Sequence, residues 1–200
     1  MSSIATKSLS SSGRALSLPN MLTYGRIAAV PAVFGSLYFI HGDFGRWLAL
    51  AIYLVACFTD WLDGYLVRIW DQQSNLGRML DPIADKLLVG ATLLILTYDN
   101  TIKGLSLWAA MIILCREILV SGLREFLAEL NVKVHVTRLA KWKTTLQMVA
   151  LAVLLAGPAG ERLVPGTTLV GLTLLWLAAL ATLWTGYDYL KAGVRHAMDE

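Results

Sequence analysis

Long apolar runs alternate with short polar segments along the whole chain. A membrane-spanning helix needs about 20 mostly apolar residues, and the sequence contains six runs close to this length. This pattern predicts an all-α integral membrane protein, a bundle of six transmembrane helices. The predicted helices cover residues 21–40, 47–67, 82–98, 105–123, 144–160 and 166–190.

The N-terminal segment, residues 1–18, has a different character. It is rich in serine and carries Lys7 and Arg14, and no acidic residue occurs before Asp43. It is either a basic amphipathic helix lying on the membrane surface or the remnant of a transit peptide. We favour the surface helix because the segment is short and runs directly into the first span. The predicted organisation is a basic segment over residues 1–18 and one membrane domain over residues 19–200.

The composition supports a membrane protein and gives no sign of nucleic-acid binding. Hydrophobic residues make up 56% of the 200 residues, only 16% are charged, and the mean hydropathy is +0.60. The sequence contains no glycine-rich phosphate loop and no nucleic-acid-binding motif. We therefore expect the lipid bilayer, and no nucleic acid, as a partner.

The basic residues are distributed unevenly between the two sides of the predicted bundle. Of the 17 lysine and arginine residues, only Arg46, Lys103 and Arg162 fall on the side away from the termini, and the other 14 lie with the termini. Loops on the inner side of a membrane are enriched in such residues. We therefore expect both termini on the cytoplasmic or matrix side, with a bacterial inner membrane favoured over a mitochondrial one.

Two pairs of aspartates lie at inner ends of the second and third predicted helices. Asp60 and Asp63 are three residues apart, and Asp81 and Asp85 are four apart, so each pair shares one helix face. If these two helices form an antiparallel pair, the four carboxylates converge. An aspartate at a helix start is often only a cap, and this would explain Asp81 alone but not two such pairs.

Four carboxylates gathered at membrane depth need compensating positive charge. Each costs on the order of 3 kcal/mol when placed in a spanning helix. A cluster of oxygen ligands without histidine or cysteine suits a hard divalent cation, Mg²⁺ or Mn²⁺, and two such ions can polarise phosphoryl oxygens. Gly64 and Gly77 lie beside the two pairs and leave room for a ligand near the backbone.

The spacing of these residues carries a family resemblance. The run D-x2-D-G-x3-R-x8-G-x3-D-x3-D, from Asp60 to Asp85 with Arg68 as its arginine, resembles the signature of the CDP-alcohol phosphotransferases, membrane enzymes with six helices. Seven fixed positions over 26 residues make the motif specific. One departure is Val67, where the family pattern usually has alanine, and this concerns local packing more than chemistry.

The resemblance implies a chemistry and a role for each motif residue. The family transfers a phosphatidyl-type group from a CDP-linked lipid to an alcohol and releases CMP. By resemblance, Asp85 is the general base that takes the proton of the acceptor hydroxyl. Two metal ions that bind the pyrophosphate would be held by Asp60, Asp63 and Asp81. The CMP pocket would be lined by Gly64, Arg68 and Gly77.

The identity of the acceptor depends on other parts of the chain. Five basic residues on the inner side are candidates for binding an anionic acceptor, although anchoring of the helices explains each of them equally well: Arg116, Arg124, Arg138, Lys141 and Lys143. Together with the N-terminal "LPNMLTYGRI", these segments resemble the branch of the family that uses glycerol 3-phosphate and yields phosphatidylglycerophosphate. In that N-terminal pattern, Asn20, Thr23 and Arg26 are candidates for contact with the nucleotide or pyrophosphate.

Three alternatives compete with this interpretation. A cardiolipin synthase of the same fold would use phosphatidylglycerol as acceptor, and acceptor assays would separate the two. A divalent-cation transporter would place its carboxylates near the bilayer midplane rather than at one face. An inactive membrane scaffold would leave the seven-position spacing unexplained. We expect CDP-diacylglycerol, glycerol 3-phosphate and CMP as ligands and, from the family resemblance, a homodimer.

Overall fold

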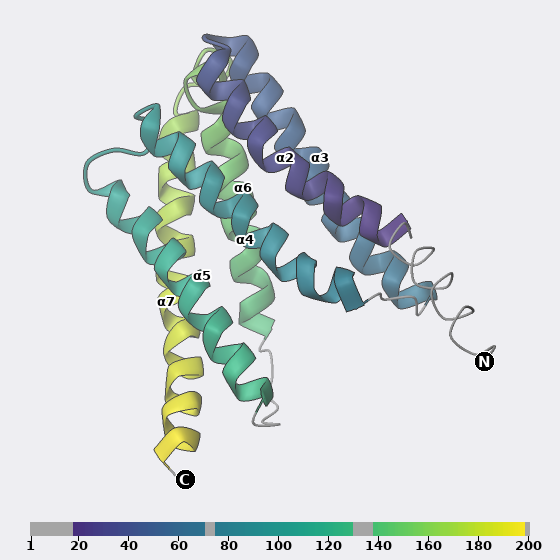
Figure 1. Cartoon of the computed structure of the whole chain (residues 1–200). Coiled ribbons are helices and arrows are strands. Elements are labelled where there is room, and N and C mark those ends of the chain that lie inside the picture. The colour runs from purple at the N-terminus through teal and green to yellow at the C-terminus, as the bar shows by residue number, and fades with distance from the viewer. Residues whose placement is uncertain (1–17, 71–74, 130–137, 199–200) are drawn as a thin grey trace, which may run out of the picture.

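In its described part, the computed structural model of the protein is entirely helical. It describes residues 18–70, 75–129 and 138–198, and the predicted N-terminal surface helix lies almost wholly outside them. The helices are α2 (Leu18–Phe39), α3 (Asp43–Trp70), α4 (Asn75–Tyr98), α5 (Ser106–Glu129), α6 (Arg138–Glu161) and α7 (Thr167–Met198) (Figure 1). No strand occurs in these three ranges. The predicted all-α class is therefore confirmed.

Four of the helices contain segments long and apolar enough to cross a membrane. These segments are Asp43–Tyr65, Ser106–Leu127, Trp142–Glu161 and Thr167–Gly186. Several such segments in one chain indicate a multi-pass membrane protein. The count of six spans stays a prediction, because α2 and α4 do not meet the same criterion within the described residues.

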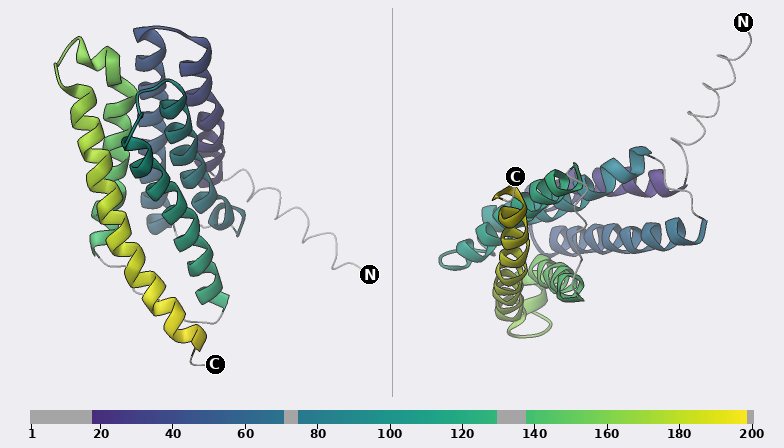
Figure 2. Two further views of the ribbon diagram at one scale, coloured as in Figure 1. Left: turned by 90° about the vertical axis from the view of Figure 1, so that its left-hand side faces the viewer. Right: turned by 90° about the horizontal axis from the view of Figure 1, so that it is seen from below.

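Helix α2 is the element that joins the two aspartate-bearing helices. It packs against both α3 and α4, while α3 also packs against α6. On the other side of the bundle, α7 packs against α6 and α5 (Figures 1 and 2). In the part of the chain that the structure describes, α3 and α4 do not pack closely against one another. Among the described residues these two helices are therefore joined through α2, which packs against both of them, rather than by direct pairing.

Both helices that carry the aspartates extend beyond the predicted apolar spans at the end where the aspartates lie. Helix α3 runs through Trp70, and α4 begins at Asn75, six residues before Asp81. Asp81 and Pro82 therefore lie within α4 rather than at its start, so a capping role for Asp81 is excluded. The helical backbone continues beyond the apolar run because its hydrogen bonds do not depend on side-chain hydropathy.

At the end of the bundle that carries the short loops, Arg46 forms contacts that join several helices and loops. Its guanidinium pairs with Asp99, donates to the hydroxyl of Thr101 at 2.9 Å and to the carbonyl of Leu155 at 3.4 Å. Helix α6 is kinked beside this contact, where Gly157 has a φ of 37°. A Cβ at Gly157 would lie 2.7 Å from Arg46 Nη1, so glycine is required there by both the backbone and the packing.

Candidate active site

The site is organised by one polar face of α2. Asn20, Thr23 and Arg26 follow one another at intervals of three residues, and all three are buried, each at most 2% exposed. A spacing of three places them along one side of the helix. Because α2 packs against α3 and α4, this polar face contacts the helices that carry the aspartates.

Arg26 lies among the aspartates and pairs with both helices at once. Its Nη2 is 2.7 Å from Asp60 Oδ1 and 4.0 Å from Asp63 Oδ2, on α3. Its Nη1 donates to Asp85 Oδ1 on α4 at 2.8 Å. The guanidinium is thus surrounded by three carboxylates, and it is 1% exposed while Asp85 is 42% exposed at its side chain.

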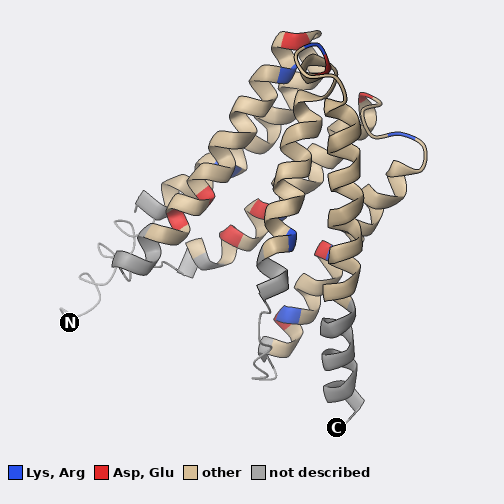
Figure 3. Cartoon of the chain, turned by 180° about the vertical axis from the view of Figure 1, so that it is seen from behind, with Lys and Arg blue, Asp and Glu red and all other residues tan. Residues whose placement is uncertain are grey.

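Thr23 brings the fourth carboxylate into the same group. Its hydroxyl lies 2.6 Å from Asp81 Oδ1 and 3.4 Å from Asp63 Oδ2. Asp60, Asp63, Asp81 and Asp85 therefore converge, as the sequence predicted, although through contacts with α2. Figure 3 shows acidic positions on the lower parts of α3 and α4, away from the end with the short loops, where α3 begins with another acidic residue, Asp43. The site is therefore near one end of the helices.

The donor set of this cluster fits a hard divalent cation, although the carboxylates are engaged otherwise. All four side chains offer oxygen, which Mg²⁺ and Mn²⁺ prefer. Asp63 Oδ1 is buried and accepts no hydrogen bond from the described residues, which is the state of a ligand that lacks its cation. Yet within the described residues no three such side chains form a ready metal-binding group. The guanidinium of Arg26 lies among them instead.

The residues predicted to line the nucleotide pocket are described unequally. Gly77 is buried, and Gly64 directly follows Asp63 and is half-buried. Both glycines lie on the aspartate-bearing helices, α4 and α3. The side chain of Arg68 lies outside the described residues. The glycine positions therefore fit the prediction, and the role of each of these residues stays a prediction.

Two of the five basic candidates come together in a second polar cluster. Arg116 on α5 contacts Glu117 at 3.2 Å and donates to the hydroxyl of Thr185 on α7 at 3.1 Å. Lys143 on α6 is 4% exposed and forms an ion pair with the same Glu117. Gly186 makes room for this arrangement, since a Cβ there would lie 3.2 Å from the Arg116 side chain.

Of the other three basic candidates, only Arg124 has a described side chain. Arg124 is exposed, and the side chains of Arg138 and Lys141 lie outside the described residues. The carboxylate of Glu117 pairs with Arg116 and Lys143. Thr185 was missed, because a threonine in an apolar helix gives no signal of what it contacts across the bundle.

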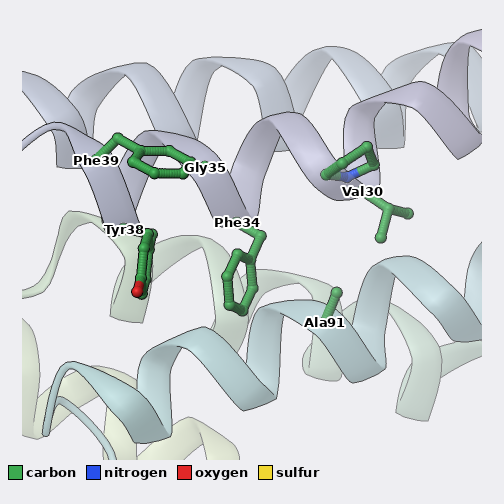
Figure 4. Close-up of a pocket in the computed structure, with 7 residues that line it drawn as sticks. Val30, Phe34, Gly35, Tyr38, Phe39 and Ala91 are labelled. Carbon is green, nitrogen blue, oxygen red and sulfur yellow. The ribbon is translucent and has the colours of Figure 1, made fainter.

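An apolar groove lies between α2 and α4, beyond the aspartates. It has a volume of about 460 Å³ and is lined by Val30, Pro31, Phe34, Gly35, Tyr38, Phe39 and Ala91 (Figure 4). It begins about one helical turn beyond Arg26 on the same helix. At its far end the ring of Tyr38 contacts that of Tyr98, with centroids 5.5 Å apart. The groove and the carboxylate cluster are therefore formed by the same pair of helices.

The chain matches one known protein family over most of its length. The profile of the CDP-alcohol phosphatidyltransferase family matches residues 16–184, which include all four aspartates and the charged residues Arg116, Glu117 and Lys143. The chain belongs to this family. The match begins just before α2, so the polar face of that helix is part of the shared sequence and not an addition to it.

Curated relatives extend over nearly the whole chain. A Rickettsia bellii protein is 45% identical over 175 residues, covering 88% of this chain and 94% of its own length. A Cereibacter sphaeroides protein is 38% identical over 217 residues, covering 92% and 98%. An Arabidopsis thaliana protein is 38% identical over 193 residues, covering 90% and 81%. The two bacterial proteins are named CDP-diacylglycerol–glycerol-3-phosphate 3-phosphatidyltransferase, and the plant protein carries the same name with the number 2.

Proposed function

We propose that the protein transfers the phosphatidyl group of CDP-diacylglycerol to glycerol 3-phosphate, giving phosphatidylglycerophosphate and CMP. The observation that carries this proposal is the convergence of Asp60, Asp63, Asp81 and Asp85 at one end of the bundle. The relatives named for the same reaction support it over most of the chain.

Metal ions are part of this proposal. Asp60, Asp63 and Asp81 would hold Mg²⁺ or Mn²⁺, two ions in the arrangement that we favour. The oxygen donors and the unpaired Asp63 Oδ1 support this assignment. When bound, the ions would neutralise charge on the pyrophosphate and on the departing CMP. The chain itself supplies the positions of the carboxylates through α2, α3 and α4.

Asp85 is proposed as the general base. Its side chain is the most exposed of the three carboxylates that pair with Arg26, 42% against 34% for Asp60 and 5% for Asp63. A base must reach the hydroxyl of an incoming acceptor, and Asp85 has the exposure that this requires. The acceptor oxygen would attack the phosphorus atom next to the lipid as its proton moves to Asp85, and the bond to CMP would break.

The lipid substrate would lie along the bundle with its head at the carboxylate cluster. Gly64, Arg68 and Gly77 are proposed to border the cytidine, as the resemblance implies. The apolar groove between α2 and α4 would take one acyl chain. From Arg26 to Tyr38 the helix rises about 18 Å, comparable with the roughly 15 Å of one bilayer leaflet. The near absence of polar atoms in the lining supports this use.

The acceptor phosphate is proposed to bind at the Arg116–Lys143 cluster. Among the described residues, Arg116 and Lys143 lie on the same carboxylate, that of Glu117, and two cations so close together can both donate to a phosphate. Lys143→Met should raise the KM for glycerol 3-phosphate by roughly ten-fold and leave the KM for the CDP-lipid little changed. Arg124→Met, at an exposed position, gives the comparison. A larger effect on the CDP-lipid would exclude this role for Lys143.

The experiment that tests the proposed function is CMP release by the purified protein from CDP-diacylglycerol with Mg²⁺. Glycerol 3-phosphate, phosphatidylglycerol, serine and inositol are offered in separate reactions. Release with glycerol 3-phosphate alone is the expected result. Release only with phosphatidylglycerol would identify a cardiolipin synthase, and no release with any acceptor would overturn the enzymatic proposal.

We also propose the placement of the site and the assembly of the protein. The carboxylate cluster is expected on the cytoplasmic or matrix face, because the basic residues gather on that side in the sequence. Labelling of cysteines introduced into the short loops near Arg46, in sealed vesicles, tests this orientation. The homodimer rests on the family resemblance, and light scattering in detergent tests it.

A further inference from the structure

The charge balance around Arg26 is unusual for a buried side chain. One guanidinium that is 1% exposed lies against Asp60, Asp63 and Asp85. A buried charge needs a partner of opposite sign, but a single carboxylate would satisfy that need. The two additional carboxylates are therefore not needed to neutralise Arg26. They repel one another, and Arg26 holds them together.

The two nitrogen atoms of this guanidinium face residues with different proposed roles. Nη2 faces Asp60 and Asp63, proposed as metal ligands, whereas Nη1 faces Asp85, proposed as the base. A divalent cation bound by Asp60 and Asp63 would lie on the same two carboxylates as the positive Nη2, which is 2.7 Å from Asp60 Oδ1 and 4.0 Å from Asp63 Oδ2. Like charges at such a distance repel strongly when they are shielded from water, so occupation of the two carboxylates by a cation disfavours the contact with Nη2.

We propose that Arg26 is an internal counter-ion of the carboxylate site, which a divalent cation displaces from Asp60 and Asp63 while Nη1 remains on Asp85. Arg26 is thus a positioning residue that links occupation of the metal site to the placement of the base. The inference rests on the proposed function for the roles of these aspartates. It also accounts for the lack of a ready three-residue metal group within the described residues.

Metal binding without substrate tests this inference directly. The detergent-solubilised protein is titrated with Mn²⁺, and free Mn²⁺ is followed by electron paramagnetic resonance. Because the cation and the guanidinium compete for the same carboxylates, Arg26→Met should bind Mn²⁺ about ten-fold more tightly than the parent, within the usual range of coupling between two ligands. An unchanged or weaker affinity would overturn the proposal. Arg26→Gln provides a second, polar replacement if the methionine variant does not fold.

A charge control separates direct competition from a general change in potential. Lys86 follows Asp85 on α4 and forms no ion pair with any residue in the described part of the chain. Lys86→Met removes one positive charge nearby without removing a contact to the carboxylates, so it should change the Mn²⁺ affinity by no more than about three-fold. An effect as large as that of Arg26→Met would refute direct competition.

Thermal unfolding gives a second readout, independent of activity. Without Arg26 the carboxylates repel one another, so Arg26→Met should melt at a lower temperature than the parent in the absence of metal, and Mn²⁺ should restore more of its stability than it adds to the parent. An equal Mn²⁺ shift in both proteins would contradict displacement.

The proposed function and the Arg26 inference can fail separately. If the parent releases no CMP, the proposed function fails, while the Mn²⁺ titrations still test the role of Arg26. If CMP is released but Arg26→Met binds Mn²⁺ no better, only the Arg26 inference fails.

Discussion

The two ends of the bundle each bury an arginine, and the two arginines have different surroundings. Arg46 pairs with one carboxylate, Asp99, and its other hydrogen bonds go to the Thr101 hydroxyl and the Leu155 carbonyl. Arg26 faces three carboxylates, and a fourth is held beside them by Thr23. A balanced pair is what stability requires, whereas a surplus of one charge is costly unless it serves a ligand. The comparison thus supports a structural role for Arg46 and the functional role proposed for the carboxylates around Arg26.

The largest effect is expected from replacing Asp85, at the end of the bundle with the carboxylate cluster. Asp85→Asn removes the proposed base but keeps the shape of the side chain, so turnover should fall by about 10²- to 10⁴-fold. Binding of the CDP-lipid should persist, because Asp85 is not among the proposed metal ligands. The melting temperature should stay equal or rise, since one repelling charge has been removed. Initial rates, lipid binding and thermal unfolding in detergent measure the three effects. Equal losses of lipid binding and turnover would move Asp85 into the metal site.

Loss of a metal ligand should produce the next largest effect. Asp60→Ala is expected to weaken CMP binding in the presence of Mg²⁺ by at least about ten-fold, because even indirect supports of a metal site matter to that extent. Without Mg²⁺ the parent and the variant should bind CMP equally weakly. Calorimetric titration with CMP in both conditions gives the measurement. Full CMP affinity of Asp60→Ala with Mg²⁺ would remove Asp60 from the metal site.

The sequence named the residues of this site, Arg26 among them, but did not predict the contacts that Arg26 makes with the aspartates. The spacing of Asp60 with Asp63 and of Asp81 with Asp85 follows from the helical period, which is a local property. The contact of Arg26 with Asp60 and Asp85 joins residues that are 34 and 59 positions apart, and no periodicity encodes it. It exists because α2 packs between α3 and α4, and the order of helices along the chain does not determine which of them pack together.

The positions where helices begin, and the contacts between helices, also show what hydropathy alone does not predict. Hydropathy predicted the six helices and their order. It placed Asp81 at a helix start, whereas α4 already begins at Asn75, because hydropathy reports the apolar segment and not the hydrogen-bonded backbone. Similarly, the pairing of Glu117 with Lys143 joins α5 to α6 and could not be chosen over the nearer Arg124 from sequence alone.

A smaller effect is expected at the balanced end of the bundle. Asp99→Asn leaves Arg46 without its carboxylate, at a contact that is mostly buried, with side-chain exposures of 12% and 17%. Loss of one partner of such a pair should cost about 2 kcal/mol and lower the melting temperature by several degrees. The kcat of the folded variant should be unchanged. A fall in kcat at unaltered stability would mean that this end also takes part in the reaction.

The smallest effect is expected in the apolar groove, where the measurement compares lipid substrates with long and short acyl chains. Gly35 lies in the lining, and a Cβ there would meet the Phe39 ring at an ordinary 3.6 Å, so Gly35→Leu fills the groove without straining the backbone. If an acyl chain lies there, the kcat/KM for a long-chain CDP-diacylglycerol should fall roughly three- to ten-fold relative to a dihexanoyl analogue, as loss of about 1 kcal/mol of apolar contact would produce.

The control for this experiment is a glycine-to-leucine change at a position with open space. Gly122 on α5 is exposed, and a Cβ there would contact nothing within 4 Å. Gly122→Leu should therefore leave the ratio of long-chain to short-chain kcat/KM unchanged. If Gly35→Leu also leaves this ratio unchanged, the acyl chain does not use the groove, and the reach of the site ends at the carboxylates. If the ratio falls only for Gly35→Leu, α2 binds the tail of the lipid with the same helix that positions the carboxylates at its head.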